Sequence, residues 1–166
     1  PVPSNSRYEH NTVLSLISSL CFLALGVALI SQYEFDIQPC AWCVLQRLIY
    51  LVIGVVALIG SFAGPIGSEL GRLVALLSAL LSAAGIATAW YQYSVASRLM
   101  SCAQTFADRF MGALGLDAAA PWLFGIYASC AEARVKLLGV EYALWSLALF
   151  VVLLVLALAA LFARRR

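Results

Sequence analysis

The stretch PCAWCVLQRLIYLVIGVVALIGSF, residues 39–62, predicts both the fold and the chemistry of the chain. A Cys-x-x-Cys pair, Cys40 and Cys43, stands at the start of a long apolar run, and Arg47 follows within the next helical turn. Residues 48–62 carry no charge, and a run of this length and composition is typical of a membrane-spanning helix. Cys43 then lies near the first turn, where the positive end of the helix dipole favours a thiolate over a thiol.

Arg47 follows Cys43 by four residues, so the two side chains share one face of the predicted helix. Arginine does not lose its proton, and the face therefore keeps a fixed positive charge. An ionisable residue within a span is a functional candidate, although a cation that snorkels near a helix end is the simpler alternative. The pattern predicts an activated dithiol pair at a membrane surface.

The composition of the whole chain indicates an integral membrane protein. Apolar residues make up 64% of the 166 residues and charged residues only 11%, whereas soluble domains carry about 25% charged residues. The net charge of +2 is small, and no basic cluster with interleaved aromatic residues occurs outside the C-terminal tail. We therefore expect no nucleic-acid partner.

Three further apolar runs have the length of a membrane span, which needs about 20 residues. The first run is too long for the apolar region of a signal peptide, and no cleavage motif of small residues follows it. The sequence therefore predicts an all-α integral membrane protein, a bundle of four transmembrane helices in one domain over residues 1–166. The expected spans are residues 12–31, 41–62, 73–93 and 142–163.

The distribution of basic residues predicts the orientation of this bundle. Four spans place both termini on one side, together with Arg7, Arg72 and the three arginines 164–166. The loop of residues 32–40 contains no basic residue, and long loops such as residues 94–141 weigh less in the positive-inside rule. We expect cytoplasmic termini and two outward-facing loops that carry cysteines.

The long loop contains a short amphipathic segment. Its apolar residues fall on one helical face and are Ala103, Phe106, Ala107, Phe110, Met111 and Leu114. The segment is predicted to form a short helix that lies in the membrane interface. Packing against the outer ends of the four spans is an equal alternative.

Aromatic residues gather at the predicted outer ends of the spans, namely Tyr33, Trp42, Tyr91, Tyr93, Tyr142 and Trp145. An interfacial belt explains them most simply. A second interpretation is that some of these rings border a site for a lipid-soluble ligand.

Four of the five cysteines lie on the predicted outer side: Cys40, Cys43, Cys102 and Cys130. Cys21 lies within the first span and is expected to be a small apolar residue. Structural disulfides are one use of the other four, with three possible connectivities. A Cys-x-x-Cys bridge, however, closes almost no loop, and this spacing supports thiol–disulfide exchange.

A metal site is less well supported, because no second close cysteine pair exists and the single histidine, His10, is predicted on the opposite side. The functional hypothesis is a relay of two pairs. Cys102 and Cys130 could meet a soluble partner, while Cys40 and Cys43 could meet an oxidant dissolved in the membrane. We expect no metal.

The chain resembles the DsbB family of bacterial disulfide-forming membrane proteins. The resemblance covers the four spans, the long outer loop and several local motifs. These motifs are Pro39-Cys40-x-x-Cys43 with Gln46-Arg47, Ser129-Cys130-Ala131-Glu132, and Leu138-Gly139-Val140-Glu141.

The resemblance implies a location in the bacterial inner membrane, with the cysteine loops in the periplasm. Cys102 would form a mixed disulfide with a thioredoxin-fold oxidoreductase of the DsbA type, and Cys130 would then attack Cys40. Cys43 would be released as a thiolate and pass electrons to a membrane quinone, either ubiquinone or menaquinone. Arg47 would stabilise the thiolate and the reduced quinone, and Gln46 belongs to the same motif.

The chain departs from the family pattern at the outer end of the third span. Family members can carry a histidine there, whereas this chain has Tyr91, Gln92 and Tyr93. Tyr91 and Tyr93 are the expected quinone contacts, because a tyrosine hydroxyl can donate a hydrogen bond to a quinone oxygen. Unlike histidine, tyrosine cannot become a cation.

Rival functions remain open on the sequence. One is an oxidase of the DsbI type that serves one dedicated partner. Another is a protein like vitamin K epoxide reductase, but proteins of that kind place their Cys-x-x-Cys pair near the last spans, whereas this chain has it at the second span. The others are not enzymes: a membrane scaffold with structural disulfides, or a metal carrier that uses thiolates.

Overall fold

The computed structural model describes residues 4–63, 68–98 and 105–162. Four long helices dominate it: α1 (Ser4–Glu34), α2 (Ala41–Phe62), α3 (Ser68–Ser94) and α7 (Tyr142–Phe162). Each contains a stretch long and apolar enough to cross a membrane. The predicted all-α bundle of four spanning helices is therefore confirmed, and the chain is a multi-pass membrane protein.

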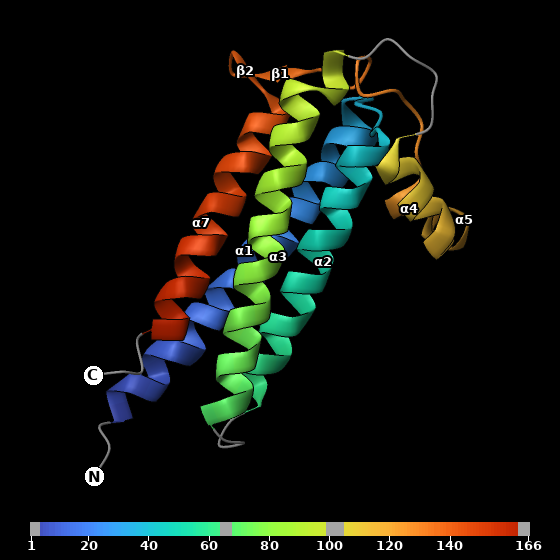
Figure 1. The fold of residues 1–166 in the computed structure, drawn as a ribbon. Helices are drawn as coiled ribbons and strands as arrows, with labels where there is room; N and C mark the ends of the chain where they lie inside the picture. The colour runs from blue at the N-terminus through green and yellow to red at the C-terminus, as the bar shows by residue number, and fades with distance from the viewer. Residues whose placement is uncertain (1–3, 64–67, 99–104, 163–166) are drawn as a thin grey trace.

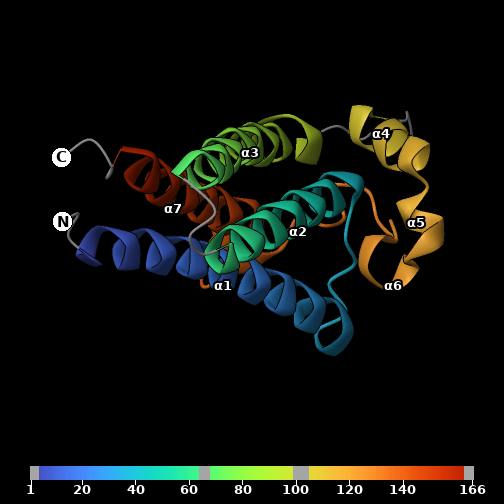
Figure 2. The same cartoon turned by 90° about the horizontal axis from the view of Figure 1, so that it is seen from below.

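The four helices run side by side as one bundle (Figure 1). α1 packs against α2 and α7, and α3 packs against the same two helices, which closes the bundle into a ring. Figure 2 shows the same four helices from below. The start of α1 and the end of α7 lie at one end (Figure 1), and the segment between α3 and α7 covers the other.

Small residues allow the helices to approach closely, as is common where helices pack in lipid. A Cβ atom added at Gly85 of α3 would lie 2.3 Å from the ring of Phe150 on α7. At Gly60 of α2 it would lie 2.8 Å from Val74 of α3. The core between the helices is filled by fully buried side chains that include Ile53 and Phe150.

α1 and α3 extend beyond the predicted spans of residues 12–31 and 73–93. A helix satisfies its backbone hydrogen bonds internally, so it can continue from an apolar run into polar flanking residues without a penalty. Hydropathy therefore gives the apolar part of a helix and not its ends.

In the part of the segment between α3 and α7 that the structure describes, there are four short helices: η1 (Ala96–Arg98), α4 (Phe106–Leu114), α5 (Leu116–Ala119) and α6 (Pro121–Phe124). α4 begins with a capping box, in which Thr105 N–H donates to the Asp108 carboxylate at 2.8 Å. It ends at Gly115, whose φ of 67° is accessible to glycine without strain. α4 thus occupies residues 106–114 of the loop segment for which a helix was predicted.

The apolar residues of α4 divide between two environments. Ala107 and Met111 are buried, whereas Phe106, Phe110 and Leu114 are exposed. Ala103 lies outside the described residues. The position of α4 in the membrane interface stays a prediction.

A two-stranded antiparallel hairpin, β1 (Lys136–Leu137) and β2 (Val140–Glu141), precedes α7. Its turn residues, Leu138 and Gly139, have φ values of 53° and 82°. Positive φ at both central residues is the geometry that two-residue hairpins require. This hairpin is not predicted by the sequence pattern, because its strands are too short to show an alternation of apolar and polar residues.

Candidate functional site

Three cysteine sulfurs meet at the end of the bundle where α2 begins, which we call the cysteine end. Cys40 is the N-cap of α2, Cys43 lies in its first turn, and Cys130 lies in a turn between α6 and β1. The Cys40 Sγ atom is 3.2 Å from that of Cys43 and 2.6 Å from that of Cys130. One sulfur therefore contacts two others, which is the arrangement that an exchange of disulfide partners requires.

The backbone holds the Cys130 segment against the residue that precedes Cys40. The carbonyl oxygen of Pro39 accepts hydrogen bonds from the N–H groups of Tyr127, at 3.1 Å, and Ala128, at 3.3 Å. Proline has no N–H of its own, but its carbonyl remains a full acceptor. These two bonds fix the distance between the two cysteine segments.

The turn that carries Cys130 is closed by Ser129 and Glu132. The Glu132 carboxylate accepts from the Ser129 N–H and hydroxyl, each at 2.9 Å. Hydrogen bonds to the charged form favour it, and these lower the pKa of Glu132. The turn thus stabilises the negative charge of Glu132, an exposed residue two positions after Cys130.

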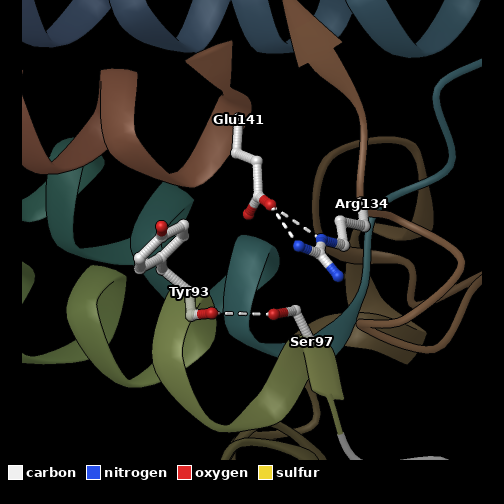
Figure 3. Close-up of polar contacts among 4 residues, drawn as sticks. All are labelled: Tyr93, Ser97, Arg134 and Glu141. Carbon is white, nitrogen blue, oxygen red and sulfur yellow. Dashed lines mark hydrogen bonds and ion pairs between the residues drawn. The ribbon is translucent and has the colours of Figure 1, made fainter.

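The chain after Cys130 is anchored to the start of α7. Arg134 donates to the Glu141 carboxylate through Nε at 2.7 Å, and its Nη2 atom lies 2.6 Å from the same oxygen (Figure 3). The Tyr142 N–H donates to the carbonyl of Val135 at 2.9 Å. The cysteine segment is consequently held at both ends, by Pro39 before it and by α7 after it.

Contact with Cys130 is the first cause that raises the pKa of the Cys40 thiol, to about 12, and burial raises it further. The hydrogen-bonding contact with Cys43 opposes these effects and lowers the pKa. A fully buried thiol of this kind is protonated at neutral pH and is a poor nucleophile. Cys40 is therefore better suited to be attacked as part of a disulfide than to attack.

A cavity of about 330 Å³ opens beside Cys43. Its walls are mainly aliphatic and include residues of all four long helices. The polar residues that reach it from the bundle are Ser31, Cys43, Gln46, Arg47, Tyr50, Gln92, Tyr142 and Ser146. An apolar cavity with a few polar groups is the usual form of a site for a small organic ligand.

Arg47 is buried at this cavity and donates to neutral oxygens. Its Nη1 atom lies 2.7 Å from Gln32 Oε1 and 2.9 Å from the Leu123 carbonyl, and Nη2 lies 3.4 Å from the Ala28 carbonyl. Among the residues that the structure describes, none places a carboxylate oxygen within 4.0 Å of this guanidinium. The charge of Arg47 is thus available to an anion, or to an oxygen that becomes negative, in the cavity.

The cavity accordingly suits a small organic ligand with an apolar body and oxygen atoms that accept hydrogen bonds. Arg47 and Gln46 supply donors, and Cys43 supplies a sulfur on the same wall. The predicted neighbours Cys43, Gln46 and Arg47 do lie together. Cys102 lies outside the described residues.

The structure does not bring Tyr91 and Tyr93 to the cavity; of the three consecutive residues at that end of α3, Gln92 lines it. Tyr91 instead packs on Trp42, with ring centroids 4.6 Å apart. The ring of Tyr93 lies 5.7 Å from that of Trp90, and its carbonyl accepts from Ser97 (Figure 3). Successive helix residues point about 100° apart, so these three side chains cannot share one wall.

Sequence reasoning also missed Tyr50 and Ser146. Tyr50 could have been found, because Cys43, Gln46, Arg47 and Tyr50 follow the spacing i, i+3, i+4, i+7 and so share one helix face. Ser146 is a single small polar residue in an apolar helix, and no pattern distinguishes it from the other serines.

No group of three or more histidine, cysteine, aspartate or glutamate side chains has a geometry that could hold a metal ion within the described ranges. The polar groups of the site are instead three sulfurs, three glutamine amides, one guanidinium and hydroxyl groups.

The fold and the site define a class: a multi-pass membrane protein with a thiol cluster at one end of its helix bundle and a ligand cavity beside it. Comparison with known proteins narrows this class. The family model described as Disulfide bond formation protein DsbB matches residues 10–160, and the chain belongs to this family. It is thus a membrane oxidoreductase concerned with disulfide bond formation.

Relatives match over most of their length. A protein of Chromohalobacter salexigens named Disulfide bond formation protein B is 36% identical, over 84% of this chain and 83% of its own. One of the same name from Azoarcus is 30% identical over 99% and 97%. Disulfide bond formation protein B 2 of Pseudomonas syringae is 33% identical over 89% and 85%.

Proposed function

We propose that the protein reoxidises a periplasmic dithiol oxidoreductase of the DsbA type and passes the two electrons to a membrane quinone. One observation carries this proposal: the Cys40 sulfur contacts both the Cys43 sulfur and the Cys130 sulfur. A single sulfur that can bond to either neighbour can transfer a disulfide from a membrane site to an outer loop.

The exchange steps balance without another reactant. The partner's two thiols reduce a disulfide between Cys102 and Cys130, and the partner leaves oxidised. The Cys130 thiolate then attacks Cys40 in a disulfide with Cys43; the Cys130–Cys40 bond forms and Cys43 leaves as a thiolate. Cys102 next attacks Cys130, which restores the loop disulfide and releases Cys40 as a thiol.

The Cys40 and Cys43 thiols must then lose two electrons and two protons to become a disulfide again. The cavity would hold a quinone, ubiquinone or menaquinone, which would accept these two electrons and two protons as a quinol. Cys43 is the cysteine that lines the cavity, and Arg47 lines it from the next turn of the same helix. Arg47 would hold a quinone oxygen and compensate its negative charge as electrons arrive.

Redox potentials support a quinone as the acceptor. A partner as oxidising as DsbA has a potential of about −120 mV, so glutathione at about −180 mV or below could not regenerate it. A periplasmic partner also requires the cysteine end to face the periplasm and the chain to lie in the bacterial inner membrane. The arginines near the opposite end of the bundle support this orientation.

The test is quinone reduction by purified protein in detergent, supplied with a reduced DsbA-type partner and short-chain ubiquinone, and in parallel with menaquinone. The parent protein is expected to consume quinone, and Cys43→Ala, Cys102→Ala and Cys130→Ala are expected to consume none. Cys21→Ala is the matched control, because Cys21 is buried between the helices and away from the cluster. It should retain the parent rate.

The outcome that contradicts the proposal is equally clear. If neither quinone is consumed by the parent and the disulfides resist mild reductant, the cysteines are structural, and the protein is a scaffold. If quinone is consumed only with one particular partner, the chain is a dedicated oxidase of the DsbI type.

A further inference from the structure

A continuous chain of hydrogen bonds runs from Tyr50 to the sulfur of Cys43. The Tyr50 hydroxyl lies 2.9 Å from Ser146 Oγ, and the Ser146 hydroxyl donates to Gln46 Oε1 at 2.6 Å. Gln46 Nε2 donates to Gln92 Oε1 at 2.6 Å, and Gln92 Nε2 donates to Cys43 Sγ at 3.1 Å. The chain links α2, α3 and α7, and all five residues line the cavity.

Every bond in this chain donates in the same direction, toward Cys43. Ser146 has one hydroxyl proton, and because it goes to Gln46, the Tyr50 proton must go to Ser146. The Tyr50 hydroxyl is also 3.2 Å from the Ser146 carbonyl, so both of its acceptors belong to that residue. Tyr50 is therefore the first donor, and the sulfur of Cys43 is the last acceptor.

The direction matters because a glutamine amide has a donor end and an acceptor end. If Gln46 were reversed, its NH₂ group would face Ser146 and its oxygen would face Gln92. Gln92 would then reverse as well, and its oxygen would face the Cys43 sulfur. An oxygen acceptor repels a thiolate, whereas an N–H donor stabilises it.

The protein interior makes this orientation consequential. Gln46, Gln92 and Tyr50 are each buried, with exposed fractions of 5%, 6% and 6%. Within the bundle no bulk water competes for their hydrogen-bonding groups, and linked bonds polarise one another in such surroundings. The direction in which Ser146 donates its proton thus determines whether Cys43 faces an N–H donor or an oxygen acceptor.

We propose that Tyr50 and Ser146 are positioning residues for Cys43, which act through Gln46 and Gln92 to keep an N–H donor directed at its sulfur. The inference rests on the proposed function, in which Cys43 works as a thiolate. Its specific content is that two hydroxyl groups that do not touch the sulfur set the reactivity of Cys43.

The experiment measures the alkylation rate of Cys43 by iodoacetamide at neutral pH, without quinone or partner. The protein keeps Cys43 as its only cysteine, with Cys21→Ala and serine at the other three positions. Ser146→Ala is expected to react about tenfold more slowly. Without the Ser146 hydroxyl the Gln46 and Gln92 amides are no longer held in one orientation, which weakens the hydrogen bond from Gln92 to the Cys43 thiolate. Tyr50→Phe is expected to react about threefold more slowly, because Ser146 can still donate without it.

Two variants separate positioning from a general structural effect. Ser146→Thr keeps the hydroxyl and should restore the parent rate. Ser82→Ala removes a hydroxyl that is fully buried and donates to its own helix, at the carbonyl of Ser78, and should leave the rate unchanged. The same ratios are expected with the larger reagent N-ethylmaleimide, because the proposal concerns the thiolate and not access to it.

The proposal is overturned if Ser146→Ala and Tyr50→Phe react at the rate of Ser82→Ala, or if Ser146→Thr is as slow as Ser146→Ala. If Ser146→Ala does not fold, Tyr50→Phe decides, since it removes one oxygen atom and keeps the ring. Failure here is distinct from failure of the proposed function: the latter appears as absent quinone reduction in the parent protein, which this assay does not involve.

Discussion

Gly85→Ala is expected to destabilise the bundle, although alanine is the better helix former. The added Cβ would lie 2.3 Å from Cδ1 and 2.4 Å from Cε1 of Phe150, well inside the contact range that begins near 3.4 Å. The ring cannot turn aside easily, because it is fully buried and stacks on Tyr50 with centroids 4.2 Å apart. α3 and α7 must therefore separate by roughly 1 Å, since interiors are close-packed.

The magnitude follows from two opposing contributions. Overpacking of this kind costs about 1–3 kcal/mol, and the helix propensity of alanine returns up to about 1 kcal/mol. The net expectation is a loss of up to about 2 kcal/mol in the free energy of unfolding relative to the parent, and of about 1–3 kcal/mol relative to a Gly→Ala exchange that meets no neighbour. Reversible unfolding in mixed micelles of a mild detergent and dodecyl sulfate, followed by circular dichroism, measures it.

Gly26→Ala is the matched control, because nothing lies within 4 Å of a Cβ added at Gly26 on α1. It should be neutral or slightly stabilising. Adding Phe150→Leu to Gly85→Ala should recover part of the loss, with a coupling energy of about 0.5–3 kcal/mol. Equal stability of the two alanine variants, or strict additivity with Phe150→Leu, would refute the close approach of α3 and α7.

Three further predictions concern the cysteine end. Arg47→Met should lower the rate of quinone reduction by about 10²- to 10³-fold, because it removes a charged donor to a developing oxyanion, and Arg47→Lys should lower it by less. Equal rates in the parent and in both variants would contradict a role for the charge. Because the pKa of Cys40 is raised to about 12, its alkylation in the reduced Cys43→Ser variant should still increase between about pH 9 and 10.5, where an ordinary thiol of pKa about 8.5 has levelled off. Tandem mass spectrometry reads the labelled site, and a plateau near pH 9 would show that the thiol is not perturbed. Glu141→Gln should lower the free energy of unfolding by about 0.2–1 kcal/mol, and by less at high salt, because the Arg134 side chain is substantially exposed. If the unfolding free energy of the variant depends on salt in the same way as that of the parent, the ion pair does not stabilise the protein.

The sign of the Cys40 effect on stability follows from the same shift. Below about pH 8.5 the thiol is protonated in both the folded and the unfolded chain, so its contribution is fully present. As the pH rises toward 12, the unfolded thiol ionises first, and the contribution is lost. The protein should therefore lose stability in alkali through this group, and not in acid.

The sequence was sufficient to predict the four spanning helices, because their apolar length is a property of each segment alone. It also placed Cys43 and Arg47 on one face, since the two residues are four positions apart in one helix. The residue pattern alone could not show that Cys130 meets Cys40, which only the family resemblance implied, because that contact depends on the Pro39 carbonyl and on a chain that returns after 90 residues.

Contacts between helices were the other part that sequence could not supply. Which of Tyr91, Gln92 and Tyr93 faces the cavity depends on the rotation of α3 about its axis, and this is set by packing such as that of Gly85 on Phe150. The assignment of the two tyrosines as quinone contacts followed the chemistry of the side chains and ignored this rotation.

The most direct test of the account is to trap the bond between Cys40 and Cys130. In the Cys43→Ser, Cys102→Ser protein, mild oxidation should join these two cysteines within one chain and leave Cys21 as a thiol, and peptide mass spectrometry identifies the product. A Cys40–Cys130 disulfide in most molecules is the predicted result, because the two sulfurs already lie in contact. If both remain thiols, or if Cys130 pairs only between molecules, the two sulfurs do not meet and the proposed relay is wrong.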